Sequence, residues 1–187
     1  MLNYENFSIR SIDQNDKDRI LLWRNSEKVS CNMYNDHQIS QQEHETWFAH
    51  ALVDNTASYL IFLHYERPIG FISFTNINEL HGRCYWAFYL GETEVPRGAG
   101  SVMEFFALDY AFLFLKIRKL CCEVFSFNSG VIKLHEKFGF LVEGKLVKHY
   151  LKKGQYEDVI CIAKFGSTWL NDRVVLKNRI FGNAENE

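Results

Sequence analysis

A glycine-rich turn at residues 97–101, Arg-Gly-Ala-Gly-Ser, has residue types that suit anion binding. Gly98 and Gly100, with small neighbours, let a ligand approach the backbone closely. A helix is predicted to start at Gly98, so unpaired N–H groups and the positive end of the helix dipole favour a phosphate or pyrophosphate there. A plain strand-to-helix connection would look the same. Neither the P-loop spacing nor the Gly-x-Gly-x-x-Gly spacing is present.

Two titratable side chains downstream of this turn could carry proton transfer. Glu123 lies in an apolar strand over residues 120–126, where a carboxylate is costly to desolvate and suits a general base acting through water. His135 can donate a proton near neutral pH. Asn128 is a good helix cap, and its spacing from His135 places both on one helix face. The alternatives are a salt bridge at the end of the sheet for Glu123 and simple packing for His135.

A strand–helix–strand–helix unit must position these residues. Residues 84–90 are aromatic and mostly apolar, which predicts a strand buried on both faces that ends before the glycine turn. The long helix, the strand with Glu123 and a short helix after Asn128 follow. The unit ends with Lys-Phe-Gly-Phe at residues 137–140.

The rest of the chain predicts helices before this unit and strands on both sides of it. Ser40 is the expected N-cap of the second helix, with Glu43 as the reciprocal capping-box residue. Residues 66–68, Glu-Arg-Pro, are the expected turn of a hairpin. Before the central unit we expect an edge strand at 7–12, a helix at 13–24, a loop or broken helix, a helix at 41–52, and strands at 58–65 and 69–77. After the central unit we expect a hairpin of strands 141–151 and 155–165, followed by a short helical tail.

Length and composition limit the class of protein. With 47% hydrophobic residues, the 187 residues can bury one substantial core, which predicts a single domain over 1–187. The net charge of −2 gives no electrostatic footprint for nucleic acid or an anionic membrane. No signal-like start or membrane-length apolar run is present, so we expect a cytoplasmic protein. Five cysteines and seven histidines lack metal-ligand spacing, so we expect reduced core cysteines and no metal.

The glycine turn resembles the Arg/Gln-x-x-Gly-x-Gly/Ala pyrophosphate loop of the GNAT superfamily of N-acetyltransferases, although Val102 occupies the last small position. The asparagine and the Lys-x-Gly-Phe ending of the unit are also similar to that family. The resemblance implies the GNAT fold, of the α/β (α+β) class, with a mixed, mostly antiparallel sheet of six to seven strands, helices on both faces and a central splayed strand pair. It implies acetyl-coenzyme A as cosubstrate and a coenzyme-binding core over about residues 82–140. The implied coenzyme-binding residues are Phe88, Tyr89, Leu90, Arg97, Gly98, Ala99, Gly100, Ser101, Val102, Asn128 and Lys137.

More of the chain resembles one branch of this family, the sugar-nucleotide N-acetyltransferases of pseudaminic acid biosynthesis. Leu-Trp-Arg-Asn at 22–25 and Ile-Gly-Phe-Ile-Ser at 69–73 are among the matching pieces. The resemblance implies that the acceptor, and the small-molecule partner, is the 4-amino group of a UDP-linked 4-amino-4,6-dideoxy sugar. We expect helices over about 13–52 to bind it, a helical tail at about 167–181, and an oligomeric state compatible with a homodimer.

Four N-terminal residues are the expected substrate contacts: Arg24, Asn25, Met33 and Tyr34. Arg24 suits a diphosphate, whereas Met33 and Tyr34 offer a thioether and a flat ring for a base or sugar face. The Trp-Arg-Asn piece is shared with ribosomal-protein and spermidine acetyltransferases, so a protein or polyamine acceptor stays open. An acetyl-coenzyme A sensor or interaction module is the non-enzymatic alternative.

The resemblance also assigns roles in the chemistry. Acetylation of an amine needs a neutral amine, a polarised thioester carbonyl and a proton for the leaving thiolate. The coenzyme's arm is expected along residues 88–90, where the strand splays from its neighbour. Glu123 is then the expected base, and His135 the acid in place of the family's tyrosine. Ser73 and Tyr89 are the expected hydrogen-bond links.

Overall fold

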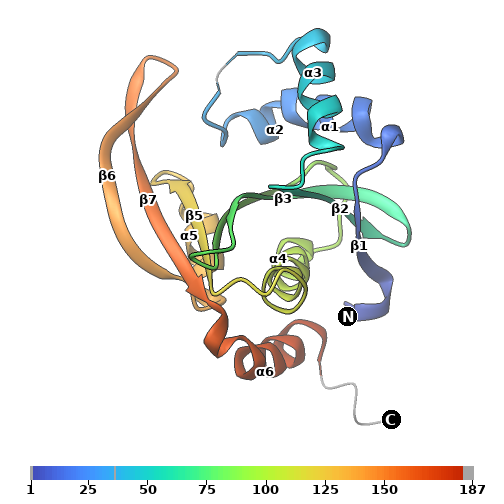
Figure 1. Cartoon of the computed structure of the whole chain (residues 1–187), viewed down its shortest axis with the longest axis vertical. Helices are drawn as coiled ribbons and strands as arrows, with labels where there is room; N and C mark the ends of the chain where they lie inside the picture. Colours follow the sequence, from blue (N-terminus) through green and yellow to red (C-terminus); the bar gives the residue numbers. More distant parts are fainter. Residues whose placement is uncertain (1, 36, 183–187) are drawn as a thin grey trace.

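A seven-stranded sheet forms the centre of the fold in the computed structural model, which describes residues 2–35 and 37–182 (Figure 1). The strand order is β1-β2-β3-β4-β5-β7-β6. Neighbouring strands are antiparallel except β4 and β5, which are parallel, so the predicted mixed, mostly antiparallel sheet is confirmed. The strands are β1 (Phe7–Ser11), β2 (Ser58–His64), β3 (Arg67–Asn78), β4 (Arg83–Leu90), β5 (Lys119–Phe125), β6 (Leu141–Lys152) and β7 (Gln155–Phe165).

Strands β4 and β5 pair over a short stretch only. Residues 83–85 pair with residues 119–121 and the register then stops, whereas β3 stays paired with β4 as far as Leu90. From Trp86 onward, the edge of β4 that faces β5 has no strand partner among the described residues. This is the predicted splayed pair, and it opens the sheet at its centre.

Helices cover both faces of the sheet (Figure 1). Helices α1, α2 and α3 lie on one face, and α4 and α6 lie on the other. Each face has its own apolar core: Trp23 and Phe48 pack with Phe71 on the first face, and α4 is buried in a larger core on the second. The helices are α1 (Lys17–Asn25), α2 (Glu27–Ser30), α3 (Gln41–Ala51), α4 (Ala99–Asp109, continued by a π-helical turn, Tyr110–Phe114), α5 (Ser129–Lys137) and α6 (Trp169–Phe181).

The prediction of a strand buried on both faces is wrong for β4. Cys84 and Trp86 are buried against α4, but Ala87 is exposed, and Phe88 and Tyr89 are half-buried. Aromatic residues suggest core packing, whereas these two rings line cavities beside the strand.

The predicted turn of the β2–β3 hairpin, residues 66–68, is also wrong: the turn begins one residue earlier and ends two residues earlier. The turn is Tyr65-Glu66, and both residues have positive φ, of 47° and 59°. Two residues with positive φ match the right-handed twist of the flanking strands. Pro68 therefore lies inside β3, next to an irregularity in the pairing of β2 at Phe62 and Leu63.

Trp23 fixes helix α1 on the sheet. Its side chain is 2% exposed, and its Nε1 donates to Glu92 Oε1 at 3.0 Å. A Cβ atom on Gly91 would lie 2.1 Å from the Trp23 ring, so glycine is required there by packing. The contact ties the helix that carries Arg24 to the end of β4.

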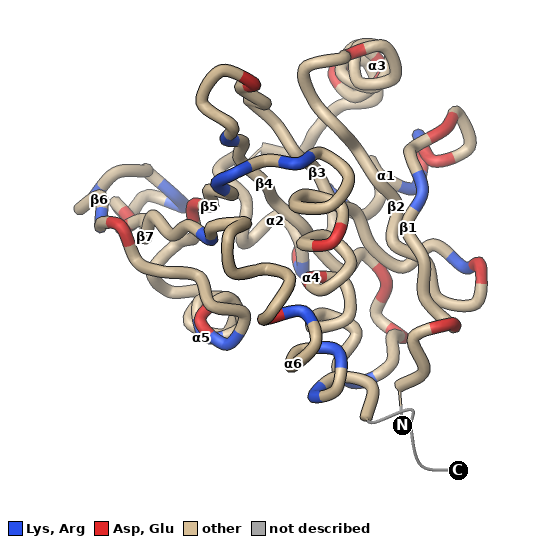
Figure 2. Tube along the Cα trace, turned by 60° about the horizontal axis from the view of Figure 1, so that its bottom comes forward, with Lys and Arg blue, Asp and Glu red and all other residues tan. Residues whose placement is uncertain are grey.

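Charge and hydropathy do not single out one ligand-binding element. Acidic and basic side chains are interspersed along the chain (Figure 2). No helix in the described ranges is both long and apolar enough to cross a bilayer. Within residues 2–35 and 37–182, no group of three or more His, Cys, Asp or Glu side chains is arranged to hold a metal ion. The candidate site is defined instead by cavities beside the sheet.

Candidate functional site

A cavity of about 170 Å³, the central cleft, opens where β4 and β5 separate. Phe88 lines it from β4 and Glu123 from β5, and Tyr34 reaches it from the loop after α2. Asn128 and His135 line the same cleft, which confirms that they face one side. Asn128 occupies the N-cap position of α5, but its side chain makes no capping hydrogen bond, contrary to the prediction, and faces the cleft instead. The other lining residues are Asn32, Met33, Ala87, Cys122, Val124, Phe125 and Val131.

His135 is buried at the edge of the central cleft and is 1% exposed. Its Nδ1 lies 2.8 Å from Oε1 of Glu104, and its Nε2 lies 3.8 Å from Sγ of Cys122. Burial alone lowers the pKa of His135, but the contacts with Cys122 and Glu104 outweigh it and raise the pKa to about 10. These contacts therefore favour the protonated imidazole.

Glu123 is half-buried and is held by a tyrosine. The Tyr34 hydroxyl donates to Glu123 Oε2 at 2.7 Å, and burial together with this bond raises the pKa of Tyr34. Tyr34 in turn stacks on Tyr150 of β6, with ring centroids 3.9 Å apart. No described cation pairs with Glu123, so the salt-bridge alternative is not what the structure contains.

The loop with Met33 and Tyr34 is fixed by the β6–β7 hairpin. Lys152 is 6% exposed, and its Nζ donates to the Met33 carbonyl at 2.6 Å and to the Ser30 carbonyl at 3.3 Å. The hairpin therefore positions two of the predicted substrate residues, although it is far from them in the sequence.

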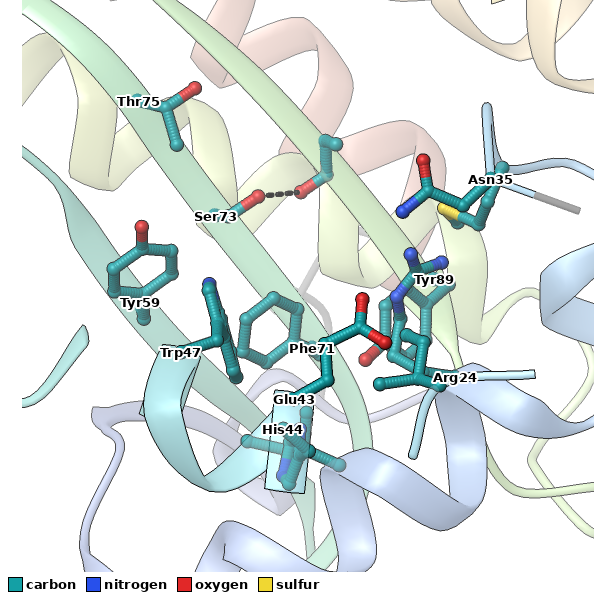
Figure 3. Close-up of a pocket in the computed structure, with 14 residues that line it drawn as sticks. Arg24, Asn35, Glu43, His44, Trp47, Tyr59, Phe71, Ser73, Thr75 and Tyr89 are labelled. Carbon is teal, nitrogen blue, oxygen red and sulfur yellow. Dashed lines mark hydrogen bonds between the residues drawn. The ribbon is translucent and has the colours of Figure 1, made fainter. Parts of the chain in front are cut away.

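A second cavity of about 380 Å³, the aromatic pocket, is lined by residues of α1, α3 and the sheet (Figure 3). One wall is a series of rings, in which Trp47 and Tyr59 have centroids 5.6 Å apart, and Phe71 and Tyr89 have centroids 5.4 Å apart. These rings give a flat apolar surface of the kind that accepts a planar or sugar-like group. The other lining residues are Ile20, Arg24, Met33, Asn35, Ile39, Glu43, His44, Ser73, Thr75 and Ala87.

Arg24 projects into the aromatic pocket from α1, beside Tyr89 (Figure 3). Its Nη1 and the Tyr89 hydroxyl are both buried without a hydrogen-bond partner among the described residues. Burial lowers the pKa of Arg24 and raises that of Tyr89, but a guanidinium stays protonated in proteins. Buried polar groups without partners are unfavourable in a free protein. Their presence in a cavity indicates that ligand atoms meet them.

Acidic groups contribute little to this pocket. Among the described lining residues the one carboxylate is Glu43, and both of its oxygens contact His37 Nε2, at 3.0 and 3.1 Å. The predicted capping box is therefore incomplete: Ser40 accepts from the Glu43 amide, but Glu43 does not reach back. His44, which is 2% exposed, donates from Nε2 to the Lys17 carbonyl at 2.7 Å. The pocket is therefore mainly aromatic, with one guanidinium and one carboxylate among its described lining residues.

The two cavities meet at Ala87. Ala87 and Met33 line both the central cleft and the aromatic pocket. Ala87 also lines an outer hollow of about 800 Å³ that includes Tyr34 and Glu123. Because Ala87 lies just past the last pair of β4 with β5, the junction coincides with the opening in the sheet. The two cavities therefore adjoin at this opening.

The glycine turn lies at the N-terminus of α4. Gly98 is the N-cap with φ 91°, and α4 starts at Ala99, one residue later than predicted. The Ala99 and Ser101 amides donate to the carbonyls of Pro96 and Gly98. The Gly98 and Gly100 amides have no acceptor among the described residues. The terminus therefore offers free donors to an anion.

Nine predicted site residues line neither cavity: the five residues of the glycine turn, Arg97, Gly98, Ala99, Gly100 and Ser101, and also Asn25, Leu90, Val102 and Lys137. Asn25 uses its side-chain amide on the backbone of Ile39, donating to its carbonyl and accepting from its amide, both at 2.9 Å. Asn25 thus fixes the segment before α3 and does not line the aromatic pocket. Val102 is fully buried in the core, and Lys137 is exposed at the end of α5.

Ser73 and Tyr89 lie on the aromatic-pocket side of the sheet and are not in the central cleft. Ser73 Oγ donates to the Ala87 carbonyl at 3.4 Å. Phe88, by contrast, contacts the His135 ring edge-on, with centroids 5.7 Å apart. The structure therefore separates the predicted catalytic set into Glu123 and His135 in the cleft, and Ser73 and Tyr89 in the pocket.

Four ring-bearing side chains that line the aromatic pocket were not predicted: His44, Trp47, Tyr59 and Phe71. Tyr59 and Phe71 follow the alternation of half-buried strands, and Trp47 is next to the buried Phe48. In the sequence they are indistinguishable from core residues. The high aromatic content, 16%, is the one signal that more rings are present than a core needs.

Comparison with known families assigns the fold. The model of the acetyltransferase (GNAT) domain matches residues 9–161. The chain therefore belongs to the GNAT acetyltransferase family, and the predicted fold is confirmed. The predicted enzyme class, acetyltransferase, is the class that this family model describes.

Individual relatives match part of the chain. It is 41% identical over 85 residues to the SPbeta prophage-derived uncharacterized N-acetyltransferase YokL of Bacillus subtilis, covering 44% of this chain and 46% of that protein. It is 29% identical over 103 residues to the spermidine N(1)-acetyltransferase of Vibrio cholerae, covering 55% of this chain and 60% of that protein. The chain thus spans roughly half the length of the curated relatives it matches.

The pseudaminic branch is represented by a more distant match. The acetyltransferase PseH of Campylobacter jejuni is 25% identical over 142 residues, covering 76% of this chain and 86% of that protein. A crystal structure of the Vibrio cholerae spermidine N-acetyltransferase with CoA and spermine superposes with a TM-score of 0.84 at 23% identity, covering 89% of this chain and 99% of that one. At that identity the likeness shows the fold alone.

Proposed function

We propose that the chain transfers an acetyl group from acetyl-coenzyme A to the amino group of a nucleotide-linked amino sugar. The aromatic pocket holds the nucleotide sugar, and the central cleft holds the thioester. The amine passes between them at Ala87. The expected acceptor is the UDP-linked 4-amino-4,6-dideoxy sugar of the pseudaminic acid pathway.

The residues present fit the coenzyme. The free Gly98 and Gly100 amides suit its pyrophosphate. A Cβ atom on Gly100 would meet nothing closer than Leu134 at 3.9 Å, so glycine is not required there by packing and leaves space for a ligand. The unpaired edge of β4 offers backbone groups to the coenzyme's arm, and Asn128 faces the same cleft. When bound, the coenzyme supplies the activated acetyl group.

The unpartnered Arg24 in a ring-lined pocket is the observation that carries the choice of acceptor. A guanidinium matches a diphosphate bidentately, and stacked rings suit a base or a sugar face. A polyamine needs several carboxylates, and the pocket has Glu43 alone among its described lining residues. A buried guanidinium would also repel a polycation.

The chain's own residues supply the proton transfers. Glu123 accepts, through water, the proton that the attacking amine loses as its nitrogen bonds to the carbonyl carbon. His135 donates its Nε2 proton to the sulfur, which keeps the electron pair of the broken carbon–sulfur bond. Tyr34 holds Glu123 in position through its hydrogen bond at 2.7 Å. Burial raises the pKa of Tyr89, and Tyr89 lies on the far side of the sheet, so it is poorly placed to replace His135.

A polyamine acceptor is the second candidate, because spermidine N(1)-acetyltransferases are among the relatives. A thiol-release assay with acetyl-coenzyme A compares three acceptors at equal concentration: the UDP-linked 4-amino sugar, spermidine and a ribosomal-protein N-terminal peptide. We expect the nucleotide sugar to have the highest kcat/KM. The same sugar without its nucleotide should be a poor acceptor, since it leaves Arg24 without a partner. Faster turnover of spermidine would refute the assignment.

A further inference from the structure

Glu104 is a buried carboxylate that neither accepts nor donates a proton in the proposed acetyl transfer. It lies inside α4, is 0% exposed, and contacts His135 through Oε1 at 2.8 Å, while its Oε2 has no partner among the described residues. A buried carboxylate is unfavourable unless it compensates a charge. Its one hydrogen-bond partner in the described structure is His135, the residue placed at the leaving sulfur. The contact therefore indicates that Glu104 contributes to the acetyl transfer through His135.

We infer that Glu104 is a positioning residue that holds His135 as an imidazolium aimed at the central cleft, so that a Glu–His pair does the work of the family's acidic tyrosine. This inference rests on the proposed acetyl transfer. Glu104 fixes Nδ1 as one proton-bearing atom, which directs Nε2 toward the cleft. Nε2 itself has only the Cys122 sulfur at 3.8 Å, a weak acceptor, so a thiolate in the cleft would be the preferred partner.

The contact with Glu104 affects whether His135 is protonated and can act as an acid. An isolated buried histidine would be neutral, because burial lowers its pKa, and a neutral imidazole is a poor acid. With Glu104 and Cys122 in contact, the pKa of His135 is raised to about 10. That is close to the ordinary value for tyrosine, about 10. The contacts therefore favour the protonated form of His135, which is the form that can act as an acid.

The charged surroundings of the pair are few. From α4, Glu104 faces His135, and from β5 the Cys122 thiol does so. The β4 rings Trp86 and Phe88 cover the imidazole with centroids 5.4 and 5.7 Å away and carry no charge. Burial raises the pKa of Glu104, whereas the contact with His135 and, to a smaller extent, Lys164 of β7 lower it. Glu104 is thus the principal negative charge that can stabilise the imidazolium.

An NMR titration of the histidines in the coenzyme-free protein tests the charge of His135 directly. We expect His135 to stay protonated through neutral pH and to lose its proton near pH 10. In Glu104→Gln, which keeps the side-chain volume, the pKa of His135 should fall, because burial still lowers it and the contribution of Glu104 is lost while that of Cys122 remains. His44, the other buried histidine among the described residues, hydrogen-bonds the Lys17 carbonyl, and unchanged resonances of its ring show that the variant keeps the fold. A neutral His135 at pH 7 in the unsubstituted protein would overturn the inference without any variant.

Kinetic measurements distinguish a role of Glu104 in positioning His135 from a role in packing the core. Glu104→Gln should lower kcat at pH 8 by about a hundredfold or more, the loss typical of a missing general acid, with KM for acetyl-coenzyme A unchanged. His135→Tyr should retain activity, and adding Glu104→Gln to it should cost less than about threefold, because a phenol needs no carboxylate. Equal losses in both backgrounds would make Glu104 structural and refute the inference.

The two proposals fail in different ways. The kinetics use whichever amine the unsubstituted enzyme acetylates. If that amine is not the nucleotide sugar, the proposed acceptor is wrong while the titration of His135 still decides the role of Glu104. If Glu104→Gln does not fold, the titration of the unsubstituted protein alone decides whether His135 is held as a cation.

Discussion

Replacing Arg24 with methionine should weaken the function and at the same time spare or increase stability. Arg24 Nη1 is buried without a partner in the free protein. Removing a buried unsatisfied polar group recovers about 1–3 kcal/mol of desolvation free energy. Methionine keeps most of the apolar contact of the stem, so the free energy of unfolding should rise or stay constant.

The functional loss follows from the contact that the guanidinium makes with the ligand. A hydrogen bond to a charged group contributes about 1.5–3 kcal/mol, which corresponds to a roughly ten- to hundredfold increase in KM for the nucleotide sugar. KM for acetyl-coenzyme A should not change, because Arg24 does not line the central cleft. Thiol-release kinetics and urea denaturation of the same preparation measure both effects.

Arg19→Met is the matched control for this experiment. Arg19 lies on the same helix, with its guanidinium 5.9 Å from the centroid of the Trp23 ring, but does not line the aromatic pocket. KM for the nucleotide sugar should be unaffected in this variant. If Arg24→Met instead left KM unchanged and lowered the free energy of unfolding by more than about 1 kcal/mol, Arg24 would be a structural residue. The choice of acceptor would then lose its main support.

Three further predictions concern the coenzyme, the junction and the packing of α1. Arg97→Glu should weaken acetyl-coenzyme A binding in calorimetry by about tenfold or more, since it places negative charge at the helix N-terminus, whereas Arg118→Glu, at the other end of the sheet, should not. Ala87→Leu should lower turnover with both substrates still bound, because Ala87 lines both cavities; unchanged turnover would place the amine's route elsewhere. Gly91→Ala should destabilise the fold by about 1–3 kcal/mol through overpacking on Trp23, and Gly144→Ala, where a Cβ meets nothing within 4 Å, is its control.

The elements of the fold are largely predictable because their periodicities are local. The order of strands and helices follows from apolar alternation and caps, and the splay of β4 from β5 follows from the family resemblance. The turn at Tyr65-Glu66 is harder to predict because a proline usually ends a strand, whereas the irregular pairing at Phe62 and Leu63 accommodates Pro68 inside β3. The capping box fails because His37 competes for the Glu43 carboxylate, and no local rule anticipates that contact.

Only part of the candidate site could be predicted from the sequence, and the reason is whether the residues come from one local unit or from distant segments. Asn128, His135 and Glu123 come from one strand–helix unit, so spacing alone brings them to one cleft. Tyr150 and Lys152 hold the Tyr34 loop across more than a hundred residues of sequence, and such a contact depends on how the hairpin curves over the sheet. In the sequence Glu104 is one more polar residue of a long helix. Its carboxylate contacts His135 only because α4 and α5 pack together in the fold.

Shared fold and shared substrate are separate questions for this chain. The likeness to spermidine acetyltransferase structures concerns the sheet and helices, and a fold hosts many acceptors. The acceptor is selected where residues face the cavity, and there the chain presents Arg24, four rings and little negative charge. A polycation in that pocket would meet the buried Arg24 guanidinium, which repels it. A diphosphate would satisfy the same guanidinium, so the charge of the pocket favours the nucleotide sugar even though higher identity lies with the polyamine enzymes.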